Sequence, residues 1–402
     1  MARKSYGDGQ KTVLVVKGGL GTRKSVLAIN LLVNLTKENM VYSYVTKNAA
    51  PRNVYATKLS GNLRKTRISN LFKGSGSFVE SAENEFDALI VDGAHRLNAK
   101  PGMFQNFWEN QIKEIIKASK FSIFFIDESQ RVTLKDIGSI EEIQKYIEKV
   151  KVEYKIMEFE SQFRCNGFDG YIVWLDDVLE IRRAANSDGF DLYYDIRICD
   201  TPNEIRDLIF EKNKINNKAR LLAGYCWNWI KEGKNKSDVH DITIPEYNFA
   251  MNWNLRNSQT WAFDEGSVNE VGCIHTAQGL EFDYVGVIIG DDLRYDNGKI
   301  ITDVKARAKT DQSVKGINKL YRNDFNRAEK VADEIIKNTY RTLMTRGQKG
   351  CYIYCTDEKL AKYFRMRLSD KNYVGYYESD DVKYNEMKVV EGKEKYFTKR
   401  GG

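Results

Sequence analysis

The segment GGLGTRKS, at residues 18–25, follows the apolar run VLVV at residues 13–16. In the pattern GxxxxGK[ST], backbone N–H groups hold phosphates, the lysine reaches the β and γ phosphates, and the hydroxyl holds Mg²⁺. Lys24 and Ser25 keep these two side chains, but Arg23 stands where the pattern has its second glycine. The segment therefore predicts a phosphate-binding loop in which one position carries a long cation.

The residues around this loop favour the same interpretation. An apolar strand is expected at residues 12–16, and apolar residues recur at helical spacing from Ser25 to about Lys37. The alternative is a glycine-rich turn without a ligand, since glycine punctuates many loops. The residues that we expect to bind the nucleotide are Gly18, Gly19, Gly21, Thr22, Arg23, Lys24 and Ser25.

The composition limits the class of protein. A chain of 402 residues with 42% hydrophobic and 30% charged residues predicts a globular protein of at least two domains. The N-terminus lacks an apolar signal core, and no segment approaches the roughly 18 apolar residues of a membrane span, so we expect a cytoplasmic protein without a membrane partner. Six scattered cysteines and three histidines make zinc improbable. The net charge of +7 permits nucleic-acid binding without demonstrating it.

Two further apolar runs end in acidic residues. FDALIVDGAHRL (86–97) places Asp92 at the end of an expected strand, and FSIFFIDESQRV (121–132) places Asp127 there. Asp92 is the candidate partner of Ser25 in holding Mg²⁺. In sequences of the form Asp-Glu-Ala-His the glutamate activates water, and here that position is Gly93, which can do no proton chemistry. Gln130 is a candidate sensor of the γ-phosphate, or else a plain loop residue.

Eight blocks in order extend these motifs over nearly the whole chain. They are GGLGTRKS, YVTKNAAPR (44–52), VDGAHRL, FFIDESQRV, SQFRCNGFDGYIVWLDDVL (161–179), AGYCWNW (223–229), EVGCIHTAQGLEFDYVGVIIG (270–290) and NTYRTLMTRGQKGCYIYC (338–355). With these blocks the chain resembles a superfamily 1 helicase, and more closely the bacterial helicase domain of the Schlafen group 3 type.

The resemblance implies roles for several residues. Arg164 is the candidate arginine finger, and Arg346, with Thr345 beside it, is expected on the γ-phosphate side. Arg341 lies about 140° from Arg346 around an ideal helix, so it is left for packing or an ion pair. The block around Gln278 is expected to couple nucleotide to nucleic acid. Gln130 and Gln278 join the two arginines as candidate catalytic residues.

The same resemblance implies a nucleic-acid interface. Its candidate residues are Thr46, Lys47, Asn48, Arg52, His275 and Thr276. For His275 a buried structural role is an equal alternative. Among the tryptophans, Trp227 and Trp229 alternate as on a strand, so we expect them to share one face and to be the first candidates for stacking on bases.

The expected fold class is α/β, with two RecA-like P-loop NTPase domains built on mainly parallel sheets flanked by helices. The first domain is expected at residues 1–157, closed by a helix over residues 140–150, and the second at 158–402, with a polar excursion at about 291–335. Nucleotide is expected between the domains. The short segment before the first strand leaves little room for a motif that reads adenine. Proteins that this chain resembles often carry extra N-terminal domains, so two alternatives stay open: a fragment that lacks N-terminal domains or partner proteins, and a shortened natural form.

Two functions remain open at this stage. The first is an ATP- and Mg²⁺-dependent helicase or translocase on single-stranded DNA or RNA, with hydrolysis impaired by Arg23 and Gly93. Loss of general-base help at Gly93 is worth about 10²- to 10⁴-fold in rate. The second is a pseudo-ATPase that binds nucleic acid or a protein without turnover.

Overall fold

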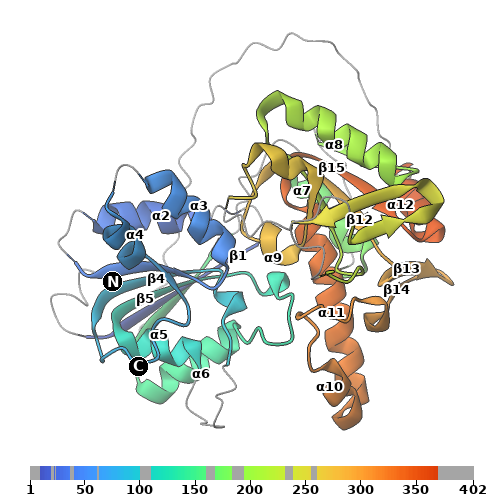
Figure 1. Cartoon of the computed structure of the whole chain (residues 1–402). Helices are drawn as coiled ribbons and strands as arrows, with labels where there is room; N and C mark the ends of the chain where they lie inside the picture. The colour runs from blue at the N-terminus through green and yellow to red at the C-terminus, as the bar shows by residue number, and fades with distance from the viewer. Residues whose placement is uncertain are drawn as a thin grey trace.

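The computed structural model describes residues 10–19, 22, 24–36, 40–60, 63–99, 110–159, 168–182, 194–230, 239–254 and 260–369. These residues form two α/β units that lie side by side, one from the N-terminal half of the chain and one from the C-terminal half (Figure 1). Each unit has its own sheet, so the expected fold class of mainly parallel sheets flanked by helices is confirmed.

The first unit contains a six-stranded parallel sheet in the order β3-β2-β4-β5-β1-β6. The central strands are nearly continuous apolar runs because helices cover both faces of the sheet. The strands are β1 (Thr12–Gly18), β2 (Tyr42–Thr46), β3 (Phe72–Gly74), β4 (Phe86–Asp92), β5 (Ser119–Ile126) and β6 (Glu153–Phe159).

Two pairs of helices pack on opposite faces of this sheet. Helices α5 and α6 share one apolar cluster with the strands, and α2 and α4 share the other. The predicted helix over residues 140–150 is confirmed, and it begins after Ser139, whose hydroxyl accepts from the Glu142 N–H at 3.0 Å. The helices are α2 (Lys24–Leu35), α3 (Ala49–Leu59), α4 (Lys65–Leu71), α5 (Gln111–Ala118) and α6 (Ile140–Val150).

The second unit contains a seven-stranded sheet in the order β7-β15-β12-β8-β11-β10-β9, parallel except where β9 pairs with β10. A separate hairpin, β13–β14, lies beyond it. The strands are β7 (Asp195–Ile198), β8 (Ala219–Ala223), β9 (Ile242–Ile244), β10 (Phe249–Trp253), β11 (Glu270–Gly272), β12 (Phe282–Ile289), β13 (Leu293–Asp296), β14 (Lys299–Thr302) and β15 (Gly347–Cys355).

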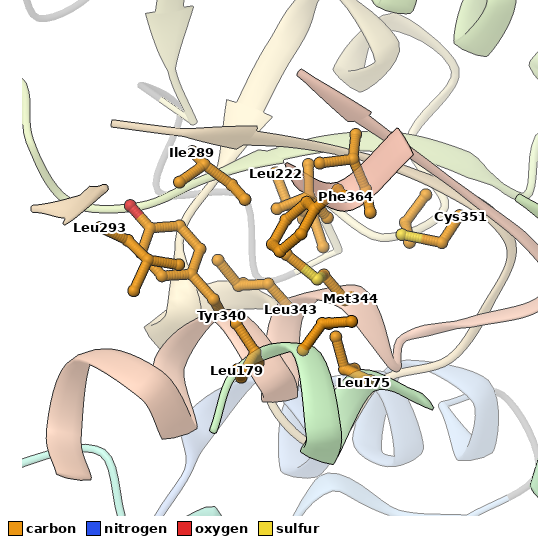
Figure 2. Close-up of a cluster of buried hydrophobic side chains, with 14 of the residues drawn as sticks. Leu175, Leu179, Leu222, Ile289, Leu293, Tyr340, Leu343, Met344, Cys351 and Phe364 are labelled. Carbon is orange, nitrogen blue, oxygen red and sulfur yellow. The ribbon is translucent and has the colours of Figure 1, made fainter. Parts of the chain in front are cut away.

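The core of the second unit lies between this sheet and its helices (Figure 2). Leu175 after the start of α7, Leu343 and Met344 of α11, and Phe364 of α12 meet the strands there. Cys351 and Cys355 are buried free thiols in β15. The helices are α7 (Phe168–Val178), α8 (Pro202–Asn216), α9 (Ile274–Ala277), α10 (Ile317–Asn323), α11 (Phe325–Met344) and α12 (Glu358–Ser369).

The first sheet runs past the boundary expected at residue 157, because β6 pairs with β1 as far as Phe159. Helix α7 already belongs to the second core. The segment expected as a polar excursion, 291–335, contains the β13–β14 hairpin, α10 and the first half of α11. Among the described residues, no helix is long and apolar enough to cross a membrane.

Candidate nucleotide site and nucleic-acid interface

Three motifs meet at one edge of the first sheet. Strands β4, β5 and β1 are neighbours, so their carboxyl ends bring Asp92, Asp127 and the loop before Lys24 together. In open α/β sheets this edge is where ligands bind. The topology therefore brings the predicted phosphate-binding loop, the predicted metal ligand Asp92 and the carboxylate of Asp127 to one edge of the sheet.

The ammonium of Lys24 lies inside its own loop. It donates to the carbonyl oxygens of Gly18 and Gly19, each at 2.6 Å, and to Thr22 Oγ1 at 3.2 Å. The Thr22 hydroxyl in turn donates to the Gly19 carbonyl at 3.0 Å. A Cβ at Gly18 would lie 2.6 Å from Thr22 Oγ1, so this loop requires glycine there. Gly21 and Arg23 lie outside the described residues.

Asp127 joins the loop to the following turn. Its Oδ2 lies 3.8 Å from Lys24 Nζ and accepts from Gln130 Nε2 at 2.7 Å, while its Oδ1 accepts from the Ser129 hydroxyl at 2.6 Å. Burial alone raises the pKa of Asp127, but the charge of Lys24 and the bonds from Ser129 and Gln130 outweigh it. The pKa therefore lies below its usual value, and Asp127 is a carboxylate.

Asp92 and Gly93 end strand β4. The Tyr44 hydroxyl donates to Asp92 Oδ2; burial first, and then the charge of Asp92, raise the pKa of Tyr44 well above its usual value, so it remains a donor. Gly93 has φ 71°, in the left-handed region, and a Cβ there would have only His95 Cε1 near it, at 3.8 Å. The site has space for a side chain, but its backbone conformation favours glycine.

Ser25 and Asp92 offer the oxygen ligands that Mg²⁺ prefers. Ser25 is the second residue of α2, and Asp92 is half-buried at the end of β4. No group of three or more His, Cys, Asp or Glu able to hold a metal occurs within the described ranges. Because Mg²⁺ is usually held by one or two carboxylates together with phosphates and water, the residues fit a metal that arrives with a nucleotide.

Two side chains of the second unit contact the turn after Asp127. Gln278 Nε2 donates to the Gln130 carbonyl at 3.0 Å and lies 3.5 Å from His95 Nε2. Arg341 Nη1 donates to the Ser129 hydroxyl at 3.0 Å. The turn thus receives hydrogen bonds from both α11 and the segment after α9.

The two arginines of the TYRTLMTRG block have separate surroundings. Buried Arg341 pairs with Asp176 of α7, which also pairs with Arg182 at 3.0 Å. Arg346 is buried in the second unit, where it donates to the carbonyl oxygens of Thr342 at 3.0 Å and Leu280 at 3.3 Å. Arg341 therefore has a hydrogen bond to the first unit. Arg164, the predicted arginine finger, lies outside the described residues.

Three of the residues predicted to contact nucleic acid bond within the first unit. Arg52 Nη1 donates to the buried Thr46 carbonyl at 3.1 Å. Lys47 Nζ donates to Asn98 Oδ1 at 2.5 Å and lies 3.6 Å from Asp136. Burial lowers the pKa of Lys47 to about 8, although Asp136 opposes this shift.

The other three, Asn48, His275 and Thr276, line one cavity of about 610 Å³ between the two units, which we call the interdomain cavity. One wall is the N-terminal part of α3, and the opposite wall contains α9. Asn48 also joins the units, since its Nδ2 donates to the Gln278 carbonyl. Four aromatic residues complete the lining: Tyr225, Trp229, Trp253 and Trp261.

Residues 11–357 match the family model described as the Schlafen group 3 DNA/RNA helicase domain. The chain belongs to this family. An uncharacterized protein of Saccharomyces cerevisiae is 23% identical over 386 residues, which cover 87% of this chain and 82% of the yeast protein. The predicted family is thereby confirmed, and with it a helicase-like nucleotide-binding domain.

Solved helicase structures are more distant from this Schlafen group 3 domain. S. cerevisiae Dbp5 bound to RNA and ADP BeF3 is 10% identical, with a TM-score of 0.33, over 91% of this chain and 84% of that one. A structure of two Pif1 helicases at forked duplex DNA is 11% identical, also with a TM-score of 0.33, over 94% and 97%. The fold assignment depends on the sheet topology above and not on these distant similarities.

The aromatic lining of this helicase domain was only partly predictable. Trp229 lines the interdomain cavity, but Trp227 lines a second cavity with Cys199 and Tyr354, so the two tryptophans do not share a face. The reason is that residues 224–230 do not form a strand, and period-two alternation has no meaning there. Trp253 and Trp261, which are buried, also border the cavity.

Proposed function

We propose that this chain is a nucleotide-dependent helicase or translocase module that acts on single-stranded DNA or RNA and hydrolyses ATP slowly. The observation that carries the proposal is the pair of contacts from Arg341 and Gln278 to the turn at Asp127. This turn is bonded to the phosphate-loop lysine on one side and to the second unit on the other. A change in the loop would therefore alter the contacts of the second unit, which forms one wall of the interdomain cavity.

The residues of the loop have separable tasks. Lys24 would exchange its carbonyl partners, Gly18 and Gly19, for phosphate oxygens, because a phosphate oxygen carries a negative charge that a carbonyl oxygen lacks. Ser25 and Asp92 would hold Mg²⁺, which supplies positive charge near the phosphates when it is bound. Gln130 would sense the γ-phosphate, and this role is supported by its side-chain bond to Asp127 and by its carbonyl, which accepts from Gln278.

A second candidate, a pseudo-ATPase that binds without turnover, is favoured by one observation. Gly93 offers no carboxylate, and the next acid along this edge, Glu128, accepts from the Ile140 N–H at 3.1 Å and so caps α6. Asp127 is already engaged by Lys24, Ser129 and Gln130. A general base at these positions would require a rearrangement.

Phosphate release, measured with and without single-stranded DNA or RNA, separates the two candidates. The informative variant is Gly93→Glu, alone and with Arg23→Gly, and the matched control is Gly93→Ala. Both substitutions at Gly93 bring a Cβ to a left-handed position, at a cost of roughly 1–2 kcal/mol, but only one adds a carboxylate. We expect slow, nucleic-acid-stimulated release by the natural chain and a rise of about 10²- to 10⁴-fold in Gly93→Glu relative to Gly93→Ala.

Other outcomes would decide against the proposal. Rapid turnover by the natural chain would exclude both the pseudo-ATPase and impaired hydrolysis. Nucleotide binding without release in every variant would favour the pseudo-ATPase. Failure to bind either nucleic acid would contradict the proposed partner while leaving the nucleotide site in place.

A further inference from the structure

The cavity that Trp227 lines, which we call the acidic cavity, has a volume of about 900 Å³ and lies at the carboxyl edge of the second sheet. Its walls contain residues at or just after the ends of four neighbouring strands, β7, β15, β12 and β8. The strands of this sheet that follow β12 and β8 in the chain, β15 and β9, lie on opposite sides of that pair. Open α/β sheets bind ligands at such a point. The acidic cavity shares no residue with the interdomain cavity.

The lining is acidic, although the chain as a whole carries a net charge of +7. Four carboxylates and two cations border the cavity: Asp200, Glu246, Asp291, Glu358, Lys362 and Arg365. Arg365 Nη2 lies 2.6 Å from the Asp200 carboxylate. Lys362 Nζ lies 3.4 Å from the Glu358 carboxylate. Each cation is therefore paired with a carboxylate of the same lining.

The other two carboxylates, Glu246 and Asp291, have no ion pair in the part of the chain that the structure describes. Asp291 Oδ1 accepts from the Thr356 hydroxyl at 2.6 Å. Burial is the main cause that raises the pKa of Tyr354 to about 12, and the charges of Glu246 and Asp291 add to it. Two negative charges without a cation therefore lie near one aromatic ring.

Three aromatic side chains border the same space: Trp227, Tyr247 and Tyr354. Trp227 is fixed, because its Nε1 donates to the Thr243 carbonyl at 3.2 Å and a Cβ at Gly290 would lie 3.5 Å from its Cη2. Tyr247 and Tyr354 meet edge to face, with ring centroids 6.1 Å apart and planes at 86°. The faces of aromatic rings attract cations, and Trp does so most strongly. Together with the carboxylates, these rings favour a positively charged ligand.

The same lining argues against two other classes of ligand. A nucleic-acid phosphate would be repelled by the net negative charge of the walls. A metal ion held by the protein alone needs several oxygen or nitrogen ligands around one point. Within the described ranges, no group of three or more His, Cys, Asp or Glu can hold a metal. An organic cation with separated ammonium groups and an apolar chain has no such requirement.

We propose that the acidic cavity binds an organic cation of the polyamine type, whose ammonium groups pair with Glu246 and Asp291 and whose methylene chain lies against Trp227. This site goes beyond the proposed function and does not depend on it. A lysine side chain of a peptide presents the same chemistry. The free polyamine is the favoured source, because one lysine has a single ammonium group and two carboxylates here lack a cation. A volume of about 900 Å³ is also within the range of about 300–1,000 Å³ that is usual for small-molecule sites.

The test is calorimetric titration of the full chain with spermidine, without nucleotide or nucleic acid. Fully N-acetylated spermidine is the control ligand, since it keeps the chain but has no charge. Glu246→Gln and Asp291→Asn each remove a charge and keep an acceptor oxygen, and Trp227→Ala removes an aromatic face. We expect each of these variants to weaken spermidine binding about 3- to 30-fold. Glu265→Gln is the matched control, because this exposed carboxylate of the second unit lines neither cavity and its loss should leave the affinity unchanged.

Four results would overturn the proposal. The natural chain could fail to bind spermidine, or bind the acetylated form equally well. Glu265→Gln could weaken binding as much as Glu246→Gln, which would show a response to overall charge alone. Mg²⁺ could displace spermidine more effectively than Na⁺ of the same ionic strength, which would indicate a metal site. A short lysine peptide that binds more tightly than spermidine, and loses affinity in the same variants, would overturn the free polyamine as the ligand. Phosphate release is a separate measurement, so failure of the cation site leaves the proposed function standing.

Discussion

The loop at Lys24 and the interdomain cavity differ in how their polar groups are satisfied. At the loop, Lys24 and Asp127 are charged, and every contact that they make is with another group of the protein. In the cavity the lining is uncharged, and ring nitrogens of Trp229, Trp261 and His275 are buried without protein partners in the described chain. A ligand at the loop would have to displace the protein contacts of Lys24. A ligand in the cavity would meet ring nitrogens that have no protein partner to give up in the described chain.

The two regions are therefore expected to respond differently when a ligand binds. A ligand of a satisfied, charged site breaks bonds as it binds, so its arrival changes the turn at Ser129 and Gln130 that the second unit contacts. A ligand of a preformed cavity changes little and gains affinity from surfaces that are already ordered. The contrast predicts that substitutions in the two regions have effects of different kinds and sizes.

The largest effect is expected from the charged network. Arg341→Met leaves Asp176 buried with only the more exposed Arg182 as its partner, and loss of one member of a buried pair costs about 3–5 kcal/mol. Urea unfolding should show this loss. Arg294→Met is the control, because its pair with Asp303 is much more exposed than the Arg341–Asp176 pair and should be worth about 0–1 kcal/mol. Equal free energies of unfolding in the two variants would contradict the expected difference between the buried pair and the more exposed pair.

Next in size is the effect of Lys24→Ala on nucleotide binding. Hydrogen bonds to charged groups are worth about 1.5–3 kcal/mol, so the affinity for a fluorescent ATP analogue should fall about 10- to 100-fold. The affinity for a single DNA strand, measured without nucleotide, should be unchanged. Lys17→Ala, which removes a half-exposed lysine paired with Glu158 at 2.7 Å, serves as the control. A loss of strand binding in Lys24→Ala alone would show that the loop and the cavity do not act independently.

A smaller effect is expected from acid. Burial is the main cause that lowers the pKa of His95 to about 3 and that of His275 to about 4, whereas the unfolded chain binds these protons near pH 6.5. Between pH 6.5 and 4 the unfolded state therefore holds more protons, and the free energy of unfolding falls as pH decreases. Urea midpoints at several pH values should decrease below 6.5. His275→Gln should flatten this dependence, and an unchanged slope would argue against a neutral His275.

The smallest effect is expected from Ser129→Ala. Its hydroxyl accepts from Arg341 and donates to Asp127, so its loss removes a link between the units worth about 1 kcal/mol. The coupling is the ratio of strand affinities with and without a nonhydrolysable ATP analogue, and it should shrink several-fold. Ser69→Ala is the control, since that exposed hydroxyl only bonds the Thr66 carbonyl. Unchanged coupling would show that the Ser129 hydroxyl does not couple the two units.

The sequence predicts the elements that carry the nucleotide site well, because local patterns determine them. The apolar runs before Lys24, Asp92 and Asp127 are strands in the structure, and helix α6 has the expected bounds. Edge strand β6 lacks such a signal, since charged and apolar residues alternate in it and nearly all are exposed.

The rest depends on packing between distant segments. Helical spacing shows that Arg341 and Arg346 face different directions, but only the packing of α11 shows that Arg341 contacts Ser129. The roles proposed for Arg346, Gln278 and the loop residues stay predictions. Likewise, tryptophan content favours stacking surfaces in general, whereas the cavity at Trp261 exists because α3 of the other unit packs opposite it.

Gly279, just after α9, has φ 85°, and a Cβ there would lie 2.7 Å from Cγ of Pro51 in α3. Bare backbone therefore faces a saturated ring across the boundary between the units. Such a contact resists closer approach of the two units, but it has no polar group that would hold one surface in register with the other. Any side chain at residue 279 would push Pro51 away and so separate α3 from α9 at this contact.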